Sequence, residues 1–274
     1  MGGTAERAGG GSVIDVADVC FAYGTQEVLH NVSFRVARHA LVAVVGPNGG
    51  GKTTLLKLLL GELAPRFGTV RVLGCAPEAA RRRVGYVPQA VPFDPRFPVS
   101  VLEVVLMGRV AKAWLGLFGR ADRAAAREAL ARVGLAGFEG RAFAAVSGGE
   151  RQRVMIAQAL AGGSELLLFD EPVANVDPEH ASRLYELFKE LAKEVTVLMV
   201  SHNLGVVTGH ASHVLCVNRT AGLHAIGEVA SGTFTEAFGG SLTAIRHDAA
   251  CHVLDPSAAL HEPHHGRQGK GCGC

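Results

Sequence analysis

The chain has 274 residues, enough for one large or two small domains with a substantial core. Charged residues make up 19% of it and the net charge is +2, which argues against a nucleic-acid binder, because such proteins concentrate basic residues on one face. Its apolar runs are too short to predict a membrane span. The first residues lack the charged-then-apolar order of a secretion signal, which favours a cytosolic chain that reaches a membrane only through a partner.

The first part of the chain has the pattern of β-strands. Residues 1–11 are rich in glycine and are expected to be flexible. After them apolar residues alternate with polar ones, which predicts antiparallel strands, whereas the run "ALVAVVG" is typical of a strand buried on both faces. That run leads into a glycine-rich loop and a helix. We expect strands over 12–24, 27–36, 40–46, 68–74 and 83–89, and the helix over 52–63.

The middle of the chain has helical spacing and no strand signals, which predicts a helical subdomain over about 95–160. Strands and helices then alternate again, and a domain over 12–245 is followed by a tail over 246–274. This order predicts an α/β fold: a mainly parallel sheet, an N-terminal antiparallel β subdomain and an inserted helical subdomain. The later elements are expected as a helix after Ser147, strands over 165–170, 195–202 and 213–219, and helices over 177–194 and 203–210.

The loop "GPNGGGKTT" predicts a phosphate site. It fits the pattern G-x-x-x-x-G-K-[ST], with a predicted strand before it and a predicted helix after it. Glycines let successive backbone N–H groups curl around a phosphate, the lysine reaches the β and γ oxygens, and the Thr53 hydroxyl can bind Mg²⁺. The expected nucleotide-binding residues here are Gly46, Pro47, Asn48, Gly49, Gly50, Gly51, Lys52, Thr53 and Thr54.

The segment "ELLLFDEP" supplies the carboxylates that such a site needs. Asp170 ends an apolar strand and is expected to hold Mg²⁺ directly or through water. Glu171 follows it and is expected to orient or deprotonate the water that attacks the γ-phosphate.

A second anion site is predicted far along the chain. In "VSGGE", Ser147 is followed by Gly148 and Gly149 where a helix begins, so free N–H groups and the positive end of the helix dipole face the same point. Lys52 and Ser147 are 95 positions apart (147 − 52), so the chain carries two phosphate motifs.

Together these motifs resemble the ATP-binding cassette (ABC) family, from about Val13 to Asp248. The resemblance implies ATP hydrolysis with Mg²⁺ as cofactor, and it assigns roles to five further motifs in chain order. The signature departs from the usual L-S-G-G-Q at Val146 and Glu150, and neither change removes its serine or glycines. The motifs are Tyr23 of "FAYG" (adenine stacking), Gln89 of "GYVPQ" (catalysis and Mg²⁺), Ser147, Gly148 and Gly149 of the signature, Asp177 of "ANVD", and His202 of "VSHN" (γ-phosphate contact).

The resemblance also explains why one chain has two phosphate motifs. In the family, the signature of one subunit faces the phosphate loop of another, so two chains enclose two ATP molecules in a head-to-tail dimer. We therefore expect a homodimer that ATP closes and hydrolysis opens.

Two longer stretches resemble the subfamily that imports zinc, manganese or iron(II): residues 85–109 and residues 200–219, which end in "CVNR". This implies an ATPase subunit at the cytoplasmic face of the membrane, beneath a separate transmembrane permease, with an extracytoplasmic metal-binding protein and no nucleic acid. A siderophore-type iron importer ATPase and a soluble cassette, such as one for iron–sulfur assembly, are the alternatives. A DNA-repair or condensin-type cassette is excluded, because Gln89 and Ser147 are 58 positions apart (147 − 89), too close for a coiled-coil insert.

The tail is rich in metal-binding residue types. Residues 247–274 hold five of the twelve histidines and three of the six cysteines, and imidazole and thiolate are natural zinc ligands. Their spacing fits no standard zinc finger, so a biased tail without function is the alternative. The candidate ligands are His261, His264, His265, Cys272 and Cys274, whereas Cys20, Cys75 and Cys216 are expected to be reduced core residues.

Overall fold

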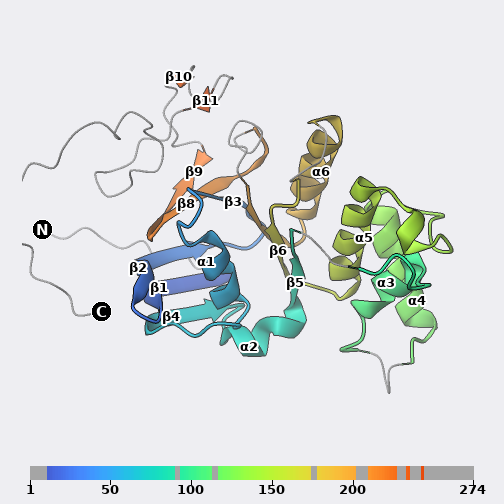
Figure 1. The fold of residues 1–274 in the computed structure, drawn as a ribbon, viewed down its shortest axis with the longest axis horizontal. Coiled ribbons are helices and arrows are strands. Elements are labelled where there is room, and N and C mark those ends of the chain that lie inside the picture. Colours follow the sequence, from blue (N-terminus) through green and yellow to red (C-terminus); the bar gives the residue numbers. More distant parts are fainter. Residues whose placement is uncertain are drawn as a thin grey trace, which may run out of the picture.

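A computed structural model describes residues 11–89, 93–112, 117–173, 178–201 and 209–226, together with the short strand pair β10 and β11. Figure 1 shows an antiparallel sheet and a group of helices at opposite ends of the molecule, with the main sheet between them. The expected α/β architecture with these three parts is confirmed.

The N-terminal sheet has the strand order β2-β1-β4 and is antiparallel throughout. Buried and exposed residues alternate along β2, because one face packs on the core and the other meets solvent. In β1 the alternation breaks at Val19, Cys20 and Phe21, which are all buried where the ladder to β2 shifts register. The strands are β1 (Ile14–Tyr23), β2 (Gln26–Val36) and β4 (Phe67–Val72).

The main sheet has the order β5-β6-β7-β3-β8-β9. The first five strands pair in parallel. The apolar runs of β3, β6 and β7 are buried on both faces, as expected for β3, whereas β5 at the edge of the sheet is only partly buried. The antiparallel strand β9 was not predicted, because all six of its residues are half-buried and show no alternation. The bounds are β3 (Leu41–Val45), β5 (Val84–Val87), β6 (Leu166–Asp170), β7 (Thr196–Val200), β8 (His213–Asn218), β9 (Thr220–Ala225), β10 (Thr233–Phe234) and β11 (Leu242–Thr243).

Two apolar cores lie on the two faces of the main sheet. On one face, α1 packs in a core with the β2-β1-β4 sheet. On the other, α3, α4, α5 and α6 share a continuous core with the strands, so the helical region rests directly on the sheet. The helices are α1 (Lys52–Leu59), α2 (Pro77–Ala80), α3 (Val101–Met107), α4 (Arg120–Arg132), α5 (Gly148–Ala161) and α6 (Pro178–Leu191), with 3₁₀ turns at Arg81–Arg83 and Phe143–Ala145.

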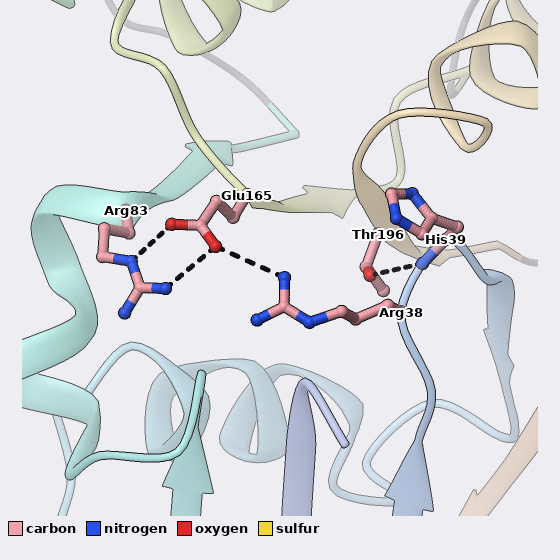
Figure 2. Close-up of polar contacts among 5 residues, drawn as sticks. All are labelled: Arg38, His39, Arg83, Glu165 and Thr196. Atoms are coloured by element: carbon pink, nitrogen blue, oxygen red, sulfur yellow. Dashed lines mark hydrogen bonds and ion pairs between the residues drawn. The ribbon is translucent and has the colours of Figure 1, made fainter. Parts of the chain in front are cut away.

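Polar side chains join the strands at the amino ends of the main sheet (Figure 2). Glu165, just before β6, accepts hydrogen bonds from Arg83 Nε and Nη2 at 2.5 and 2.8 Å and from Arg38 Nη1 at 3.5 Å. The His39 backbone N–H donates to the Thr196 hydroxyl at 3.0 Å. These contacts tie β5, β6, β3 and β7 together at the edge opposite the one where β6 ends in Asp170.

Within the described ranges, no helix has both the length and the apolar character needed to cross a membrane. Most of the helix predicted over 203–210, and the whole tail over 246–274, lie outside the described residues.

Candidate nucleotide site

The predicted phosphate loop joins the end of β3 to the start of α1. Gly46 has φ 151°, and a Cβ atom there would lie 1.9 Å from the Val217 carbonyl oxygen of β8, so only glycine fits. The backbone N–H of Arg219 donates to Gly50 O at 3.0 Å. The "CVNR" segment, residues 216–219, therefore packs against the phosphate loop and supports it.

Lys52 lies inside the curve of this loop. Its ammonium group donates to the carbonyl oxygens of Gly46 and Pro47 at 2.8 and 2.9 Å, and the residue is only 7% exposed. Burial lowers the pKa of Lys52, whereas the negative charges of Glu171 and Asp170 raise it. A positive charge held at a glycine-rich loop is suited to binding phosphate oxygens.

Asp170 and Glu171 follow one another at the carboxyl end of β6, as expected. Glu171 has φ 52°, a left-handed backbone conformation. This conformation costs a residue other than glycine about 1–3 kcal/mol and is concentrated at functional sites. Its carboxylate accepts a hydrogen bond of 2.8 Å from Gln89 Nε2, which lies just past the neighbouring strand β5. The structure therefore brings together two predicted residues that are 82 positions apart.

Tyr86 is a residue of this site that the sequence did not reveal. It pairs with Leu168 across β5 and β6, so its side chain shares a face with Asp170, two residues further along β6. Burial, the nearby charges of Asp170 and Glu62, and a hydrogen bond with Asp170 raise the pKa of Tyr86 to about 12. The phenol is therefore a neutral donor to Asp170 at physiological pH, and strand alternation was the signal that could have revealed it.

A cleft of about 340 Å³ unites most of these groups. Tyr23 forms part of its wall with a 48% exposed side chain, held edge-on against Phe21 with ring centroids 4.9 Å apart. The cleft thus has an aromatic surface, a phosphate loop and a carboxylate in one space. Its lining residues are Tyr23, Gln26, Val28, Asn48, Gly49, Gly51, Lys52, Thr53, Thr54 and Glu171. Gln26 and Val28 are additions to the predicted set.

The signature is absent from the lining of this cleft and lies at the start of α5. Ser147 is the N-cap: its hydroxyl accepts from the Glu150 backbone N–H at 3.3 Å, and the Glu150 carboxylate accepts from the Ser147 N–H at 2.7 Å. Ser147 and Gly148 are exposed. The two phosphate motifs therefore present separate surfaces.

The structure also accounts for both departures in the signature. Val146 is buried in the core, where any apolar side chain of similar size serves. The Glu150 side chain turns back to cap its own helix. The pKa of Glu150 is lowered, first by the hydrogen bond from the Ser147 backbone, then by the Ser147 hydroxyl contact and the charges of Arg141 and Arg153. Its charge is engaged at the helix terminus. Two other predicted residues, Asp177 and His202, and the tail ligands lie outside the described residues.

A buried parallel strand, a phosphate loop and helix, and carboxylates at the end of a neighbouring strand define a P-loop nucleoside-triphosphatase. The sequence model of the family described as "ABC transporter" matches residues 29–174, more than half of the chain. The chain belongs to the ABC transporter family, as an ATPase that binds and hydrolyses ATP. A model of an AAA domain also matches the shorter stretch 141–208.

Several relatives match over most of their length. A "Probable metal transport system ATP-binding protein" of Chlamydia pneumoniae is 40% identical over 74% of this chain and 84% of its own. The zinc transport system ATP-binding protein TroB of Treponema pallidum is 37% identical over 88% and 95% of the two chains. The manganese transport system ATP-binding protein MntB of Halalkalibacterium halodurans is 37% identical over 76% and 83%.

The fold is similar to that of solved ABC cassettes. The cbiO1 protein from Clostridium perfringens, part of the ABC transporter complex cbiONQ, has a TM-score of 0.71 and 25% identity, covering 80% of this chain and 90% of its own.

Proposed function

We propose that this chain powers the import of a divalent metal ion, zinc or manganese, through a separate membrane permease. The observation that carries the ATPase half of this proposal is the single cleft that holds Lys52, the phosphate loop and Glu171. The metal half is supported by relatives whose names specify metal, zinc and manganese transport.

In the cleft, Tyr23 stacks on adenine, and the loop 46–54 with Lys52 binds the phosphates. Thr53 in the cleft and Asp170 and Gln89 beside it would hold Mg²⁺. Bound Mg²⁺ would neutralise charge on the β and γ oxygens. Glu171 orients and deprotonates the attacking water. Gln89 holds the Glu171 carboxylate in place through the 2.8 Å hydrogen bond. Asp177 and His202 complete the set by the family pattern.

Two chains act as a homodimer. This is supported by the distance in sequence and the separate surfaces of the two phosphate motifs: Lys52 lines the cleft, whereas Ser147 and Gly148 are exposed outside it. In a head-to-tail pair, Ser147, Gly148 and Gly149 of each chain would face the γ-phosphate bound by the other. The ATPase domain spans 12–245.

The permease docks on the helical region. Four exposed large apolar side chains lie in or near α3 along the chain: Phe97 before it, Met107 at its end and Val110 and Leu117 after it, with exposures of 64%, 47%, 56% and 72%. Exposed large apolar side chains are a residue type that protein interfaces use. Phe97 is eight positions after Gln89 (97 − 89), so a partner bound there would lie close in sequence to the nucleotide site. In this proposal the chain lies peripherally at the cytoplasmic face of the membrane, and an extracytoplasmic metal-binding protein serves the same system.

The test is metal accumulation in the native host. Cells that lack this chain should accumulate less zinc or manganese from chelator-limited medium, and the wild-type chain should restore uptake while Glu171→Gln should not. Uptake of iron offered as a siderophore complex is measured in parallel. A defect confined to that uptake would assign the protein to the siderophore-type importers. Unchanged accumulation of all these metals would refute the transport proposal.

A further inference from the structure

Outside the nucleotide cleft, three side chains of metal-ligand type converge on the β1–β2 hairpin. Cys20 of β1 and Glu27 and His30 of β2 place one potential ligand atom each within 4.8 Å of the other two. His30 Nδ1 and Glu27 Oε1 are 2.9 Å apart. Three donors from two paired strands are a different feature from an ordinary exposed ion pair, because the third donor is a buried thiol.

The donor set has the chemistry of a zinc site. Thiolate, imidazole and carboxylate are the three side-chain ligands of Zn²⁺, and tetrahedral bonds of about 2.0–2.3 Å place ligand atoms roughly 3.3–3.8 Å apart, so small side-chain adjustments suffice. A thiolate and a carboxylate together neutralise a divalent ion. Three protein ligands leave the fourth position to water, which is typical of open sites rather than closed structural ones.

The surroundings support a metal-bound thiolate. The backbone N–H of Asn31 donates to Cys20 Sγ at 3.3 Å, and Asn31 adopts the left-handed φ of 46° that directs this group. A hydrogen bond to a ligating sulfur stabilises the thiolate and orients it. The Glu27 and His30 side chains are 43% and 45% exposed, so an ion can reach the buried sulfur from their side.

The cluster is connected to the nucleotide cleft through the backbone. The His30 N–H donates to Arg219 O at 2.7 Å, and the Arg219 N–H donates to Gly50 O of the phosphate loop at 3.0 Å. Tyr23, in the wall of the cleft, is three residues beyond Cys20 on the same strand. An ion that joins β1 to β2 therefore restrains the strands that support both ends of the nucleotide.

We propose that Cys20, Glu27 and His30 form a binding site for a zinc-class divalent ion on the ATPase itself, placed to restrain the adenine-binding hairpin and the phosphate loop. This site is separate from the transport path through the permease and from the Mg²⁺ of ATP hydrolysis. It gives the ATPase subunit a direct contact with the class of ion that its system carries.

Zinc binding by the full-length protein, without nucleotide, tests this proposal. Competition with a chromogenic chelator should show one fewer zinc per chain in Cys20→Ala and His30→Gln, and at least about tenfold weaker binding at one site in Glu27→Gln. With Co²⁺ as the probe, the thiolate-to-cobalt absorption should decrease in Cys20→Ala. The tail is identical in every variant, so it cancels from these differences.

Matched controls separate the site from general effects. Cys75→Ala removes a thiol that donates to Val72 O outside the cluster, and His39→Gln removes an exposed histidine; both should keep the full zinc content. Because Cys20 is buried, its variant is checked for folding by circular dichroism, while the half-exposed His30 provides an independent result. Wild-type zinc content in folded Cys20→Ala or in His30→Gln would show an ordinary ion pair beside a core thiol and would overturn the proposal.

Discussion

Gln89 Nε2 donates a hydrogen bond to Glu171 Oε2 across 2.8 Å. The two residues follow the adjacent parallel strands β5 and β6, so the sheet itself sets their separation. Gln89 also begins the segment that leads to the helical region and α3. Any displacement of that region by a docked partner would act on the proposed catalytic carboxylate through this hydrogen bond.

Glu171→Gln should nearly abolish ATP turnover while ATP binding is retained. The amide keeps the size of the side chain and can still accept from Gln89, but it cannot take a proton from water, so the rate should fall by about 10²–10⁴-fold. ATP should then hold a stable dimer in gel filtration. Glu165→Gln, at the opposite edge of the sheet, is the matched control and should hydrolyse ATP normally. Wild-type turnover by Glu171→Gln would remove Glu171 from the role of base.

Mixing two inactive variants should recover activity if the site is shared between chains. Lys52→Ala should weaken ATP binding by roughly 10–100-fold, because a charge-assisted contact is lost, and Ser147→Arg should block hydrolysis without much change in monomer affinity. In the mixed dimer one composite site has both segments intact, so partial ATPase activity should return.

Loss of the helix cap needs its own control, since Ser147 caps α5. Ser100 caps α3 with an equivalent capping box, so Ser100→Ala should cost about 1 kcal/mol of stability and leave hydrolysis in place. Heterodimers that form but stay inactive at every mixing ratio would contradict action between chains.

Tyr86→Phe should weaken Mg²⁺ binding by the ATPase without removing a catalytic group. The ring stays and the hydroxyl that bonds Asp170 is lost, so the carboxylate is less firmly oriented and the Mg²⁺ concentration for half-maximal rate should rise up to about tenfold. Tyr185→Phe, which removes a buried hydroxyl 3.2 Å from Ser201 Oγ, is the control for lost packing and should leave that concentration unchanged. If Tyr86→Phe reaches half-maximal rate at the same Mg²⁺ concentration as wild type, the hydroxyl has a purely structural role.

Glu165 should contribute stability that disappears in acid. Its hydrogen bond with Arg83, then the charges of Arg83 and Arg38, hold its pKa below the ordinary value in the folded chain (Figure 2). A lowered folded-state pKa means that the contribution is complete above the unfolded pKa of about 4.3 and is lost as pH falls through the folded value. Because the side chain is 39% exposed, Glu165→Gln should cost about 1 kcal/mol or less at pH 7. Urea unfolding at several pH values should show this gap closing in acid; a gap independent of pH would contradict it.

The histidines and cysteines of residues 247–274 are predicted to bind zinc as a flexible site. A chain ending at Arg246 should bind fewer zinc ions than the full chain in competition with a chelator, and the affinity of the lost site should fall as pH drops through about 6.5, because imidazole must be deprotonated. Its ATPase activity should persist, since all the predicted phosphate-contacting residues precede position 203. Equal zinc content in the two chains would eliminate the tail site. Cys20 is present in both, so this result is independent of the hairpin site.

Much of this molecule was predictable because its signals are local. The continuous run before Gly46 identified a strand buried on both faces, and the order glycine loop, lysine, threonine identified the phosphate site within one short segment. Asp170 and Glu171 followed from the end of a second apolar strand. The strands up to β8 were predicted for the same reason: backbone and side-chain preferences over five to ten residues decide them. The strand β9 was missed because half-buried residues leave no periodic pattern.

What only the tertiary structure decided depends on which distant segments become neighbours. The order β5-β6-β7-β3-β8-β9 places Gln89 beside Glu171, Tyr86 beside Asp170, and Val217 against Gly46. The packing of β2 against the end of β8 brings His30 to Arg219, whereas the β1–β2 pairing brings it to Cys20. Sequence spacing carries no record of these distances, because a crossover helix or loop can return the chain to either side of a strand, and only the packing of the two cores selects one arrangement.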